Sequence, residues 1–224
     1  MSSNAPAAGD WMTKIKICGL RRMEDITIVN ELQPEYIGFV FFPCSRRYIK
    51  PEEAARLREK LSPGIRAVGV FVDASVEMVS DLIRQDIISI VQLHGRENAA
   101  YISELRERTD DKARIIKAEL IHTEEDIRRA SGSTADSVLL DAGLGAGKTF
   151  DWQLLRDFGR PYFLAGGLTI ANVSGAVRTL QPYAVDVSSG VETDGYKDPA
   201  KVEAFITAVR EADAAGRTRQ EALA

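Results

Sequence analysis

The sequence predicts an α/β protein with a single (β/α)8 barrel, the TIM-barrel fold. Short apolar runs rich in β-branched residues alternate with amphipathic stretches, and this alternation repeats eight times along the chain. No linker rich in Pro, Gly or Ser interrupts it. The 224 residues suffice for such a barrel, which typically needs roughly 200–250 residues. An open doubly wound sheet is the alternative, but it predicts a glycine-rich phosphate fingerprint after the first strand, and Cys18-Gly19-Leu20 is not one.

The eight apolar runs are the predicted strands. Most of them are too short and too apolar for antiparallel strands with one solvated face, so we expect parallel strands buried on both faces. They cover residues 14–18, 36–41, 67–72, 88–93, 114–120, 137–141, 162–165 and 184–188.

Helices are expected between these strands. Ser75 is a good N-cap for a run with apolar residues at helical spacing. Pro51 and Pro199 suit the first turn of two further helices. A fourth helix should follow the strand at 162–165, with one apolar face formed by Ile170, Val173, Val177 and Leu180.

We expect a disordered N-terminal extension over residues 1–13, a barrel domain over 14–212 and a C-terminal tail over 213–224.

Composition and charge exclude several classes of protein. The net charge of −4, without blocks of like charge, predicts no nucleic-acid partner and no binding to a membrane surface. No run approaches the roughly 20 apolar residues of a membrane span. The two cysteines suggest no disulfide framework, so a cytoplasmic location is expected.

Chemistry-bearing residues fall just after the predicted strands. In a barrel of parallel strands, such positions gather on one rim, where TIM-barrel active sites lie. Asp73 and Glu119 are expected only to shape this rim or to pair with basic neighbours. The residues that follow the predicted strands are Cys18, Arg47, Asp73, His94, Glu119, Asp141, Gly166, Gly167 and the run 188–190.

Two glycine-containing segments predict a phosphate site. Gly166 and Gly167 follow the seventh strand and precede a helix, and Ser189, Gly190 and Val191 follow the eighth. Backbone N–H groups of these loops and a helix N-terminus commonly bind phosphate in barrels. Each segment alone could be a simple tight turn, but both together, at these two strands, favour an anionic substrate.

A third glycine-rich segment resembles a relaxed P-loop. Residues 142–149 read AGLGAGKT, with Ala in place of the first Gly of the strict motif. The segment follows the sixth strand, so too little chain remains for a nucleoside-triphosphatase core. Its glycines fit a lid over the rim better.

Cys18 and Asp141 are the acid–base candidates. A cysteine at a strand end is usually a small buried hydrophobic residue, whereas a carboxylate that ends a buried strand needs another explanation. Lys16 shares the parity of Cys18 and could lower the pKa of the thiol; its alternative role is an ion pair with Asp186. His94 could be a base or a metal ligand. Because the chain has only two histidines, no metal site is expected.

Seven ordered stretches resemble the phosphoribosylanthranilate isomerase family over about residues 14–209. They read KICGL, GFVFFPCSRRYI, VGVFVD, VQLHG, LLDAGLGAGKTFDW, FLAGGL and VDVSSGVE. The loop after Asp141 departs from the family, in which many members carry a longer segment there. This leaves the role of Lys148 open.

The resemblance implies an Amadori rearrangement in tryptophan biosynthesis. N-(5′-phosphoribosyl)anthranilate would become 1-(2-carboxyphenylamino)-1-deoxyribulose 5-phosphate, with Cys18 as general base and Asp141 as general acid. Arg47 would bind the anthranilate carboxylate, with Arg46 as the fallback, and Asp186 and His94 would contact the substrate. Each step is a proton transfer, so we expect no cofactor and no metal. The expected partner is this small phosphosugar substrate, and the expected assembly is a monomer or homodimer.

Three rival functions stay open at this point. The Amadori isomerase of histidine biosynthesis is also a phosphate-binding barrel, but its family resembles a repeated half-barrel with Asp in place of Cys18. A P-loop nucleotidase would bind ATP with magnesium. A catalytically silent phosphosugar-binding barrel would need neither Cys18 nor Asp141.

Overall fold

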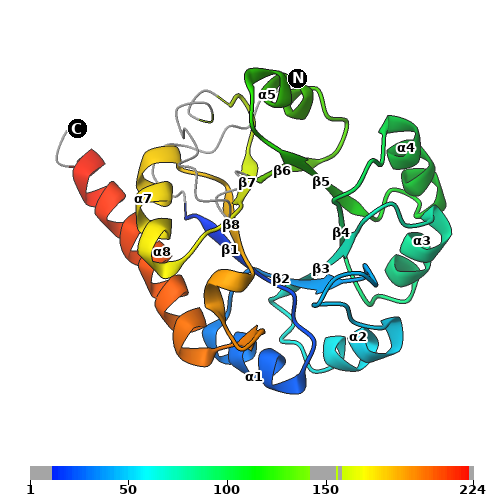
Figure 1. Cartoon of the computed structure of the whole chain (residues 1–224), viewed down its shortest axis with the longest axis horizontal. Helices are drawn as coiled ribbons and strands as arrows, with labels where there is room; N and C mark the ends of the chain where they lie inside the picture. Colours follow the sequence, from blue (N-terminus) through cyan, green and yellow to red (C-terminus); the bar gives the residue numbers. More distant parts are fainter. Residues whose placement is uncertain (1–11, 142–154, 156–157, 222–224) are drawn as a thin grey trace.

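The computed structural model describes residues 12–141, 155 and 158–221. Eight parallel strands form a closed barrel in which each strand pairs with the next in the chain and β8 pairs with β1. Figure 1 shows this ring of strands with the helices around its outside. The predicted single (β/α)8 barrel is therefore confirmed.

The strands agree closely with the apolar runs of the sequence. β1, β5, β6 and β7 have the predicted bounds, and the other four differ by one or two residues. Ile88 is buried but precedes β4, so hydrophobicity alone overestimates that strand. The strands are β1 Lys14–Cys18, β2 Tyr36–Val40, β3 Arg66–Phe71, β4 Ile90–Leu93, β5 Arg114–Leu120, β6 Ser137–Asp141, β7 Tyr162–Ala165 and β8 Ala184–Val187.

The helices begin at the residues that the sequence signals. The Ser75 hydroxyl accepts a hydrogen bond from the Met78 N–H at 3.3 Å, and Pro51 occupies the first turn of its helix. Residues 142–154 and 156–157, between β6 and β7, lie outside the described residues. The helices are α1 Met23–Leu32, α2 Pro51–Arg58, α3 Val76–Arg84, α4 Ala99–Arg108, α5 Glu124–Ser131, α7 Ile170–Leu180 and α8 Pro199–Glu221.

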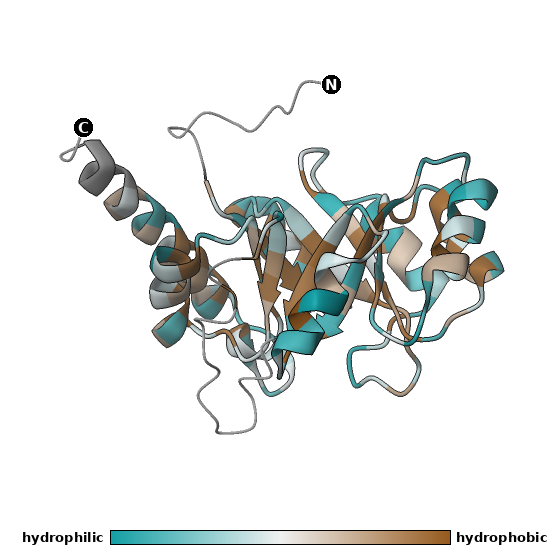
Figure 2. Cartoon of the chain, turned by 90° about the horizontal axis from the view of Figure 1, so that it is seen from above, coloured by the Kyte–Doolittle hydropathy of each residue, from teal (hydrophilic) through white to brown (hydrophobic). Residues whose placement is uncertain are grey.

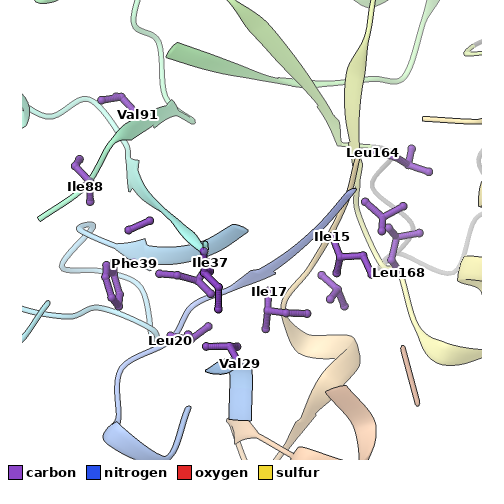
Figure 3. Close-up of a cluster of buried hydrophobic side chains, with 14 of the residues drawn as sticks. Ile15, Ile17, Leu20, Val29, Ile37, Phe39, Ile88, Val91, Leu164 and Leu168 are labelled. Carbon is purple, nitrogen blue, oxygen red and sulfur yellow. The ribbon is translucent and has the colours of Figure 1, made fainter. Parts of the chain in front are cut away.

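The two faces of β1 show how the core sets up the interior of the barrel. Ile15 and Ile17 are fully buried in the large cluster between the strands and the helices. Figure 3 shows Ile17 near Leu20 and near Val29, which lies on α1. Because side chains alternate along a strand, Lys16 and Cys18 point the other way, into the barrel. Apolar residues accordingly concentrate on the strands in Figure 2, whereas hydrophilic residues lie mainly on the outer helices and loops.

The ends of the domain extend beyond the predicted limits of 14 and 212. Thr13 is fully buried. Its N–H and hydroxyl donate to the two carboxylate oxygens of Asp213, at 2.9 and 2.8 Å. α8 continues to Glu221, because residues 211–221 are mostly strong helix formers. Residues 1–11 and 222–224, in the predicted extension and tail, lie outside the described residues.

A short excursion follows β8 before α8 begins. The 3-10 turn η2 covers Ser189–Val191, and the strands β9 (Glu192–Thr193) and β10 (Tyr196–Lys197) form a small antiparallel hairpin. This hairpin places Glu192 and Lys197 beside the end of β1. Within the part of the chain that the structure describes, no helix is long and apolar enough to cross a membrane.

Candidate active site

The end of β1 joins a buried lysine, a carboxylate and a thiol. The Lys16 ammonium donates to both Asp186 oxygens, at 3.0 and 3.1 Å, and its charge also acts on the Cys18 thiol. Gly38 of β2 makes room for this group, because a Cβ there would lie 2.6 Å from the Cys18 Sγ and 3.2 Å from the Lys16 Nζ. The Lys16–Asp186 ion pair that the sequence left as an alternative is therefore present.

The surroundings of Cys18 raise the pKa of its thiol. Burial raises the pKa of the Cys18 thiol above its ordinary value, and the Lys16 ammonium opposes this shift without cancelling it. Burial alone would lower the pKa of Lys16, but Asp186 and Cys18 outweigh it and raise that pKa. Lys16 thus acts on the thiol in the expected direction, but burial and the Asp186 carboxylate leave the pKa of Cys18 above its ordinary value.

Asp141 and His94 lie together on the same rim. Asp141 is the last residue of β6. It stands two positions after Leu139, which packs inside the barrel, so both side chains lie on the inner face of the strand. The His94 Nε2 lies 3.9 Å from the Asp141 Oδ2, and its Nδ1 lies 3.2 Å from the Gln92 Nε2. Burial lowers the pKa of His94, and the nearby Asp141 carboxylate opposes this shift without cancelling it. His94 thus links the end of β6 to the end of β4.

Arg47 is held by a carboxylate that the sequence analysis did not single out. Its Nε donates to the Glu192 Oε1 at 2.7 Å and its Nη2 to the Oε2 at 2.9 Å. Arg46, with a side chain 65% exposed, also reaches Glu192, at 3.2 Å. An arginine has five N–H donors in a planar fork, so the contact with Glu192 engages two of them and fixes the plane of the guanidinium.

Glu192 also binds a buried lysine, Lys197. The Lys197 Nζ donates to the Glu192 Oε1 at 2.7 Å and to the Ser188 carbonyl oxygen at 3.0 Å. The Ser188 hydroxyl donates in turn to the Cys18 carbonyl oxygen at 2.9 Å. Burial raises the pKa of Glu192, but Arg47 and Lys197 outweigh burial and lower it to about 2. Burial lowers the pKa of Lys197. This network connects Arg47 to the strand that carries Cys18.

The segments with the predicted phosphate residues lie side by side. Gly166 and Gly167 adopt φ angles of 93° and 61°, which residues with a Cβ rarely adopt. A Cβ on Gly190 would collide with the Leu168 carbonyl oxygen, so η2 packs directly against the loop after β7. Ser189 and Val191 belong to η2. The structure thus brings the two glycine segments together at the start of α7.

The remaining sequence candidates have structural partners or lie elsewhere. The Asp73 carboxylate accepts from the Arg96 N–H at 2.6 Å, and Glu119 accepts from Arg129 at 2.9 Å, as expected for rim carboxylates with basic neighbours. Cys44 is exposed. The P-loop-like run 142–149, which includes Lys148, lies outside the described residues. Within the described ranges, no group of three or more His, Cys, Asp or Glu side chains could hold a metal ion.

Sequence reasoning missed Gln92, Glu192 and Lys197. Gln92 and Glu192 stand in the stretches VQLHG and VDVSSGVE, and their positions two residues before His94 and four after Ser188 were available signals. Lys197 belongs to no such stretch, and only the hairpin after β8 brings it to the site.

Comparison with known proteins identifies the family. The family profile described as N-(5′-phosphoribosyl)anthranilate (PRA) isomerase matches residues 15–208. The chain belongs to this family. It is 44% identical to the N-(5′-phosphoribosyl)anthranilate isomerase of Acetivibrio thermocellus over 214 residues, which cover 90% of this chain and 98% of that protein. The isomerase of Herminiimonas arsenicoxydans is also 44% identical, over 91% of this chain and 95% of its own length.

Solved structures of this family share the fold. The crystal structure of phosphoribosyl anthranilate isomerase from Thermotoga maritima superposes with a TM-score of 0.81 at 39% identity, covering 89% of this chain and all of that one. A family structure in complex with reduced 1-(o-carboxyphenylamino)-1-deoxyribulose 5-phosphate gives 0.80 at 38% identity, with the same coverage.

Proposed function

We propose that this chain catalyses the Amadori rearrangement of its family with Cys18 as general base and Asp141 as general acid. The reaction converts N-(5′-phosphoribosyl)anthranilate to 1-(2-carboxyphenylamino)-1-deoxyribulose 5-phosphate, an aldose–ketose isomerisation in tryptophan biosynthesis. The observation that carries the proposal is the placement of Cys18 and Asp141 at the ends of β1 and β6, on one rim of the barrel, in a chain that matches the family over residues 15–208.

The chemistry needs one group that gives a proton and one that removes a proton. Asp141 protonates the ribose ring oxygen, and the ring C1–O bond breaks as the amine nitrogen forms a Schiff base. Cys18, as thiolate, then removes the proton from C2 and leaves an enolamine. The ketone forms when C1 gains a proton and the C2 hydroxyl loses one. Proton transfers account for every step, so we propose that no cofactor or metal takes part.

The thiolate must form despite the raised pKa of Cys18. Lys16 is the cation next to the thiol, and it favours the charged form. If a bound substrate draws Asp186 into a new hydrogen bond, the ammonium is shared less with that carboxylate and more with the thiolate. We therefore assign Lys16 and Asp186 to the same catalytic unit, with Asp186 in contact with the substrate.

The two charged ends of the substrate have separate binding groups in this proposal. Backbone N–H groups of Gly166, Gly167 and the Ser189–Val191 turn bind the phosphate, supported by the N-terminus of α7. Arg47 binds the anthranilate carboxylate through the edge of its guanidinium that Glu192 leaves open. His94 contacts the substrate next to Asp141.

The proposal also covers the oligomeric state and the cellular location of the enzyme. A structure of the Thermotoga maritima relative is described as a monomer generated from a dimeric protein. We propose a monomer or homodimer for this chain as well, in the cytoplasm, acting on a small phosphosugar and on neither nucleic acid nor a membrane.

The test is turnover of freshly prepared phosphoribosylanthranilate, followed by the loss of anthranilate fluorescence. Cys18→Ser replaces the thiol with a hydroxyl that does not ionise near neutral pH, and Asp141→Asn removes the proton donor. Each should lower kcat by about 10²–10⁴-fold, while binding of the reduced product analogue is largely retained. Cys44→Ser, at the exposed cysteine, is the matched control and should keep wild-type kcat. Full activity of Cys18→Ser would remove Cys18 from the mechanism.

A further inference from the structure

Gln92 is a buried polar residue inside the barrel that the proposed mechanism does not use. It lies on β4 two residues after Ile90, which packs in the barrel interior, and it is only 2% exposed. Its Nε2 lies 3.2 Å from the His94 Nδ1. Its Oε1 accepts no hydrogen bond from the described residues. Among the described residues, the hydrogen-bond partner of this side chain is therefore the histidine beside Asp141.

The contact with Gln92 decides where the proton of a neutral His94 resides. An amide nitrogen can only donate, so the His94 Nδ1 must accept, and the single ring proton is on Nε2. That nitrogen faces the Asp141 Oδ2 at 3.9 Å. A flipped amide would place a ring lone pair toward the carboxylate, and it would leave both buried amide N–H donors without the His94 acceptor that one of them now has. The orientation in the structure avoids both effects.

The surroundings of His94 keep its ring neutral. The His94 side chain is 40% exposed, but its neighbours on the rim desolvate the ring enough to lower its pKa. Four charged groups act on the ring: Asp141 of β6 and Asp186 of β8 favour the charged imidazolium, whereas Lys16 of β1 and Lys117 of β5 oppose it. The neutral ring has one proton, so its two tautomers are the states that Gln92 can select between.

We propose that Gln92 is a positioning residue that holds His94 in the neutral Nε2–H tautomer. The ring proton then points toward Asp141 and stabilises the carboxylate that forms when Asp141 has given its proton to the substrate. This inference rests on the proposed role of Asp141 as general acid. The tautomer itself does not, because it follows from the contacts of the free protein.

The experiment uses the fact that the chain has only two histidines. Two-bond 1H–15N correlation spectra of protein labelled with 15N-histidine report the tautomer of each ring. In the wild type at pH 7.5, His94 should show the Nε2–H pattern. His122, which is exposed like His94 but lies before α5, serves as the internal reference for a solvent-exposed ring.

Three variants show whether Gln92 is responsible. Gln92→Leu should give His94 a mixture of tautomers and lower kcat about 10-fold, well below the 10²–10⁴-fold typical of a direct acid or base, with KM little changed. Gln92→Glu should reverse the tautomer, because a carboxylate accepts from Nδ1–H. Gln85→Leu, at the exposed end of α3, is the control and should change neither spectrum nor kcat.

An Nδ1–H pattern for His94 in the wild type would overturn the proposal, and this spectrum needs no variant to fold. A Gln92→Leu enzyme with wild-type tautomer and kcat would overturn it too. The two proposals fail separately. A fully active Asp141→Asn enzyme refutes the general acid and leaves the tautomer of His94 as measured.

Discussion

Two buried lysine–carboxylate pairs lie on opposite sides of the barrel wall. Lys16 and Asp186 pair inside the barrel, with side chains 0% and 9% exposed. Lys117 and Glu97 pair outside it, at 3.3 Å, with side chains 10% and 1% exposed. Burial and pairing are thus nearly the same for both, but their remaining hydrogen-bond partners differ.

The outer pair is satisfied by the backbone. The Lys117 Nζ donates to the Gly95 carbonyl oxygen at 2.6 Å, and Glu97 accepts from the Asp73 N–H at 2.8 Å and the Gly95 N–H at 2.9 Å. These bonds fix the loop after β4, next to His94, to the loop after β3. The hydrogen bonds of the Lys117–Glu97 pair therefore stabilise the two loops.

The inner pair has a reactive partner instead. The Lys16 ammonium pairs with Asp186 and also acts on the Cys18 thiol, and a Cβ at Gly38 would crowd both Lys16 and Cys18. A buried ion pair by itself therefore does not mark a functional site. What distinguishes the two pairs is whether the third neighbour is a backbone group or a group that can gain and lose a proton.

The largest effect should come from removing the inner ammonium. Lys16→Met leaves Asp186 buried without its partner, and breaking a buried pair costs about 3–5 kcal/mol of the free energy of unfolding. Lys16 lowers the pKa of Cys18, so its loss raises that pKa further, and less thiolate forms at a given pH. The limb of the kcat–pH profile that rises as the thiol deprotonates should move to higher pH. Urea unfolding and the pH profile measure the two effects.

Lys60→Met is the matched control for this change, because Lys60 is an exposed lysine. It should alter neither the unfolding midpoint nor the pH profile. If the kcat–pH profile of Lys16→Met is not shifted, the ammonium does not act on the thiol. The inner pair would then have no more functional role than the outer pair.

A smaller effect, confined to stability, is expected at the outer pair. Glu97→Gln removes the charge, but Lys117 keeps its carbonyl acceptors, so the free energy of unfolding should fall by about 1–3 kcal/mol. The double variant Glu97→Gln with Lys117→Met removes both charges and should recover part of this loss. In both proteins kcat should stay close to wild type. A kcat loss as large as that of Cys18→Ser would place this pair in the catalytic machinery.

An effect on substrate binding alone should separate two neighbouring arginines on Glu192. Arg47 is 18% exposed and binds through two N–H groups, whereas the Arg46 side chain is 65% exposed and makes one contact. Arg47→Ala should weaken substrate binding by about 1.5–3 kcal/mol, the value of a charge-assisted contact, seen mainly as a higher KM. Arg46→Ala should cost less than about 1 kcal/mol. Equal losses would indicate that both arginines bind the anthranilate carboxylate of the substrate.

Much of the fold could be predicted from the sequence because parallel barrel strands are short and apolar on both faces. That pattern gave the exact limits of β1, β5, β6 and β7. It also placed Cys18, His94 and Asp141 at strand ends, and parallel strands bring such ends to one rim. The pattern was less reliable where an apolar residue packs without joining a strand, as Ile88 does.

The sequence by itself determined the order of the elements, the family and the rim on which the acid–base candidates lie, since these depend on local periodicity and short motifs. Only the tertiary structure decided which charges pair. Asp186 lies 170 positions from Lys16, and Glu192 lies 145 from Arg47. The raised pKa of Cys18 follows from such pairings and from burial. A thiol takes its pKa from the charges and solvent within a few ångströms, and folding draws those neighbours from remote parts of the chain.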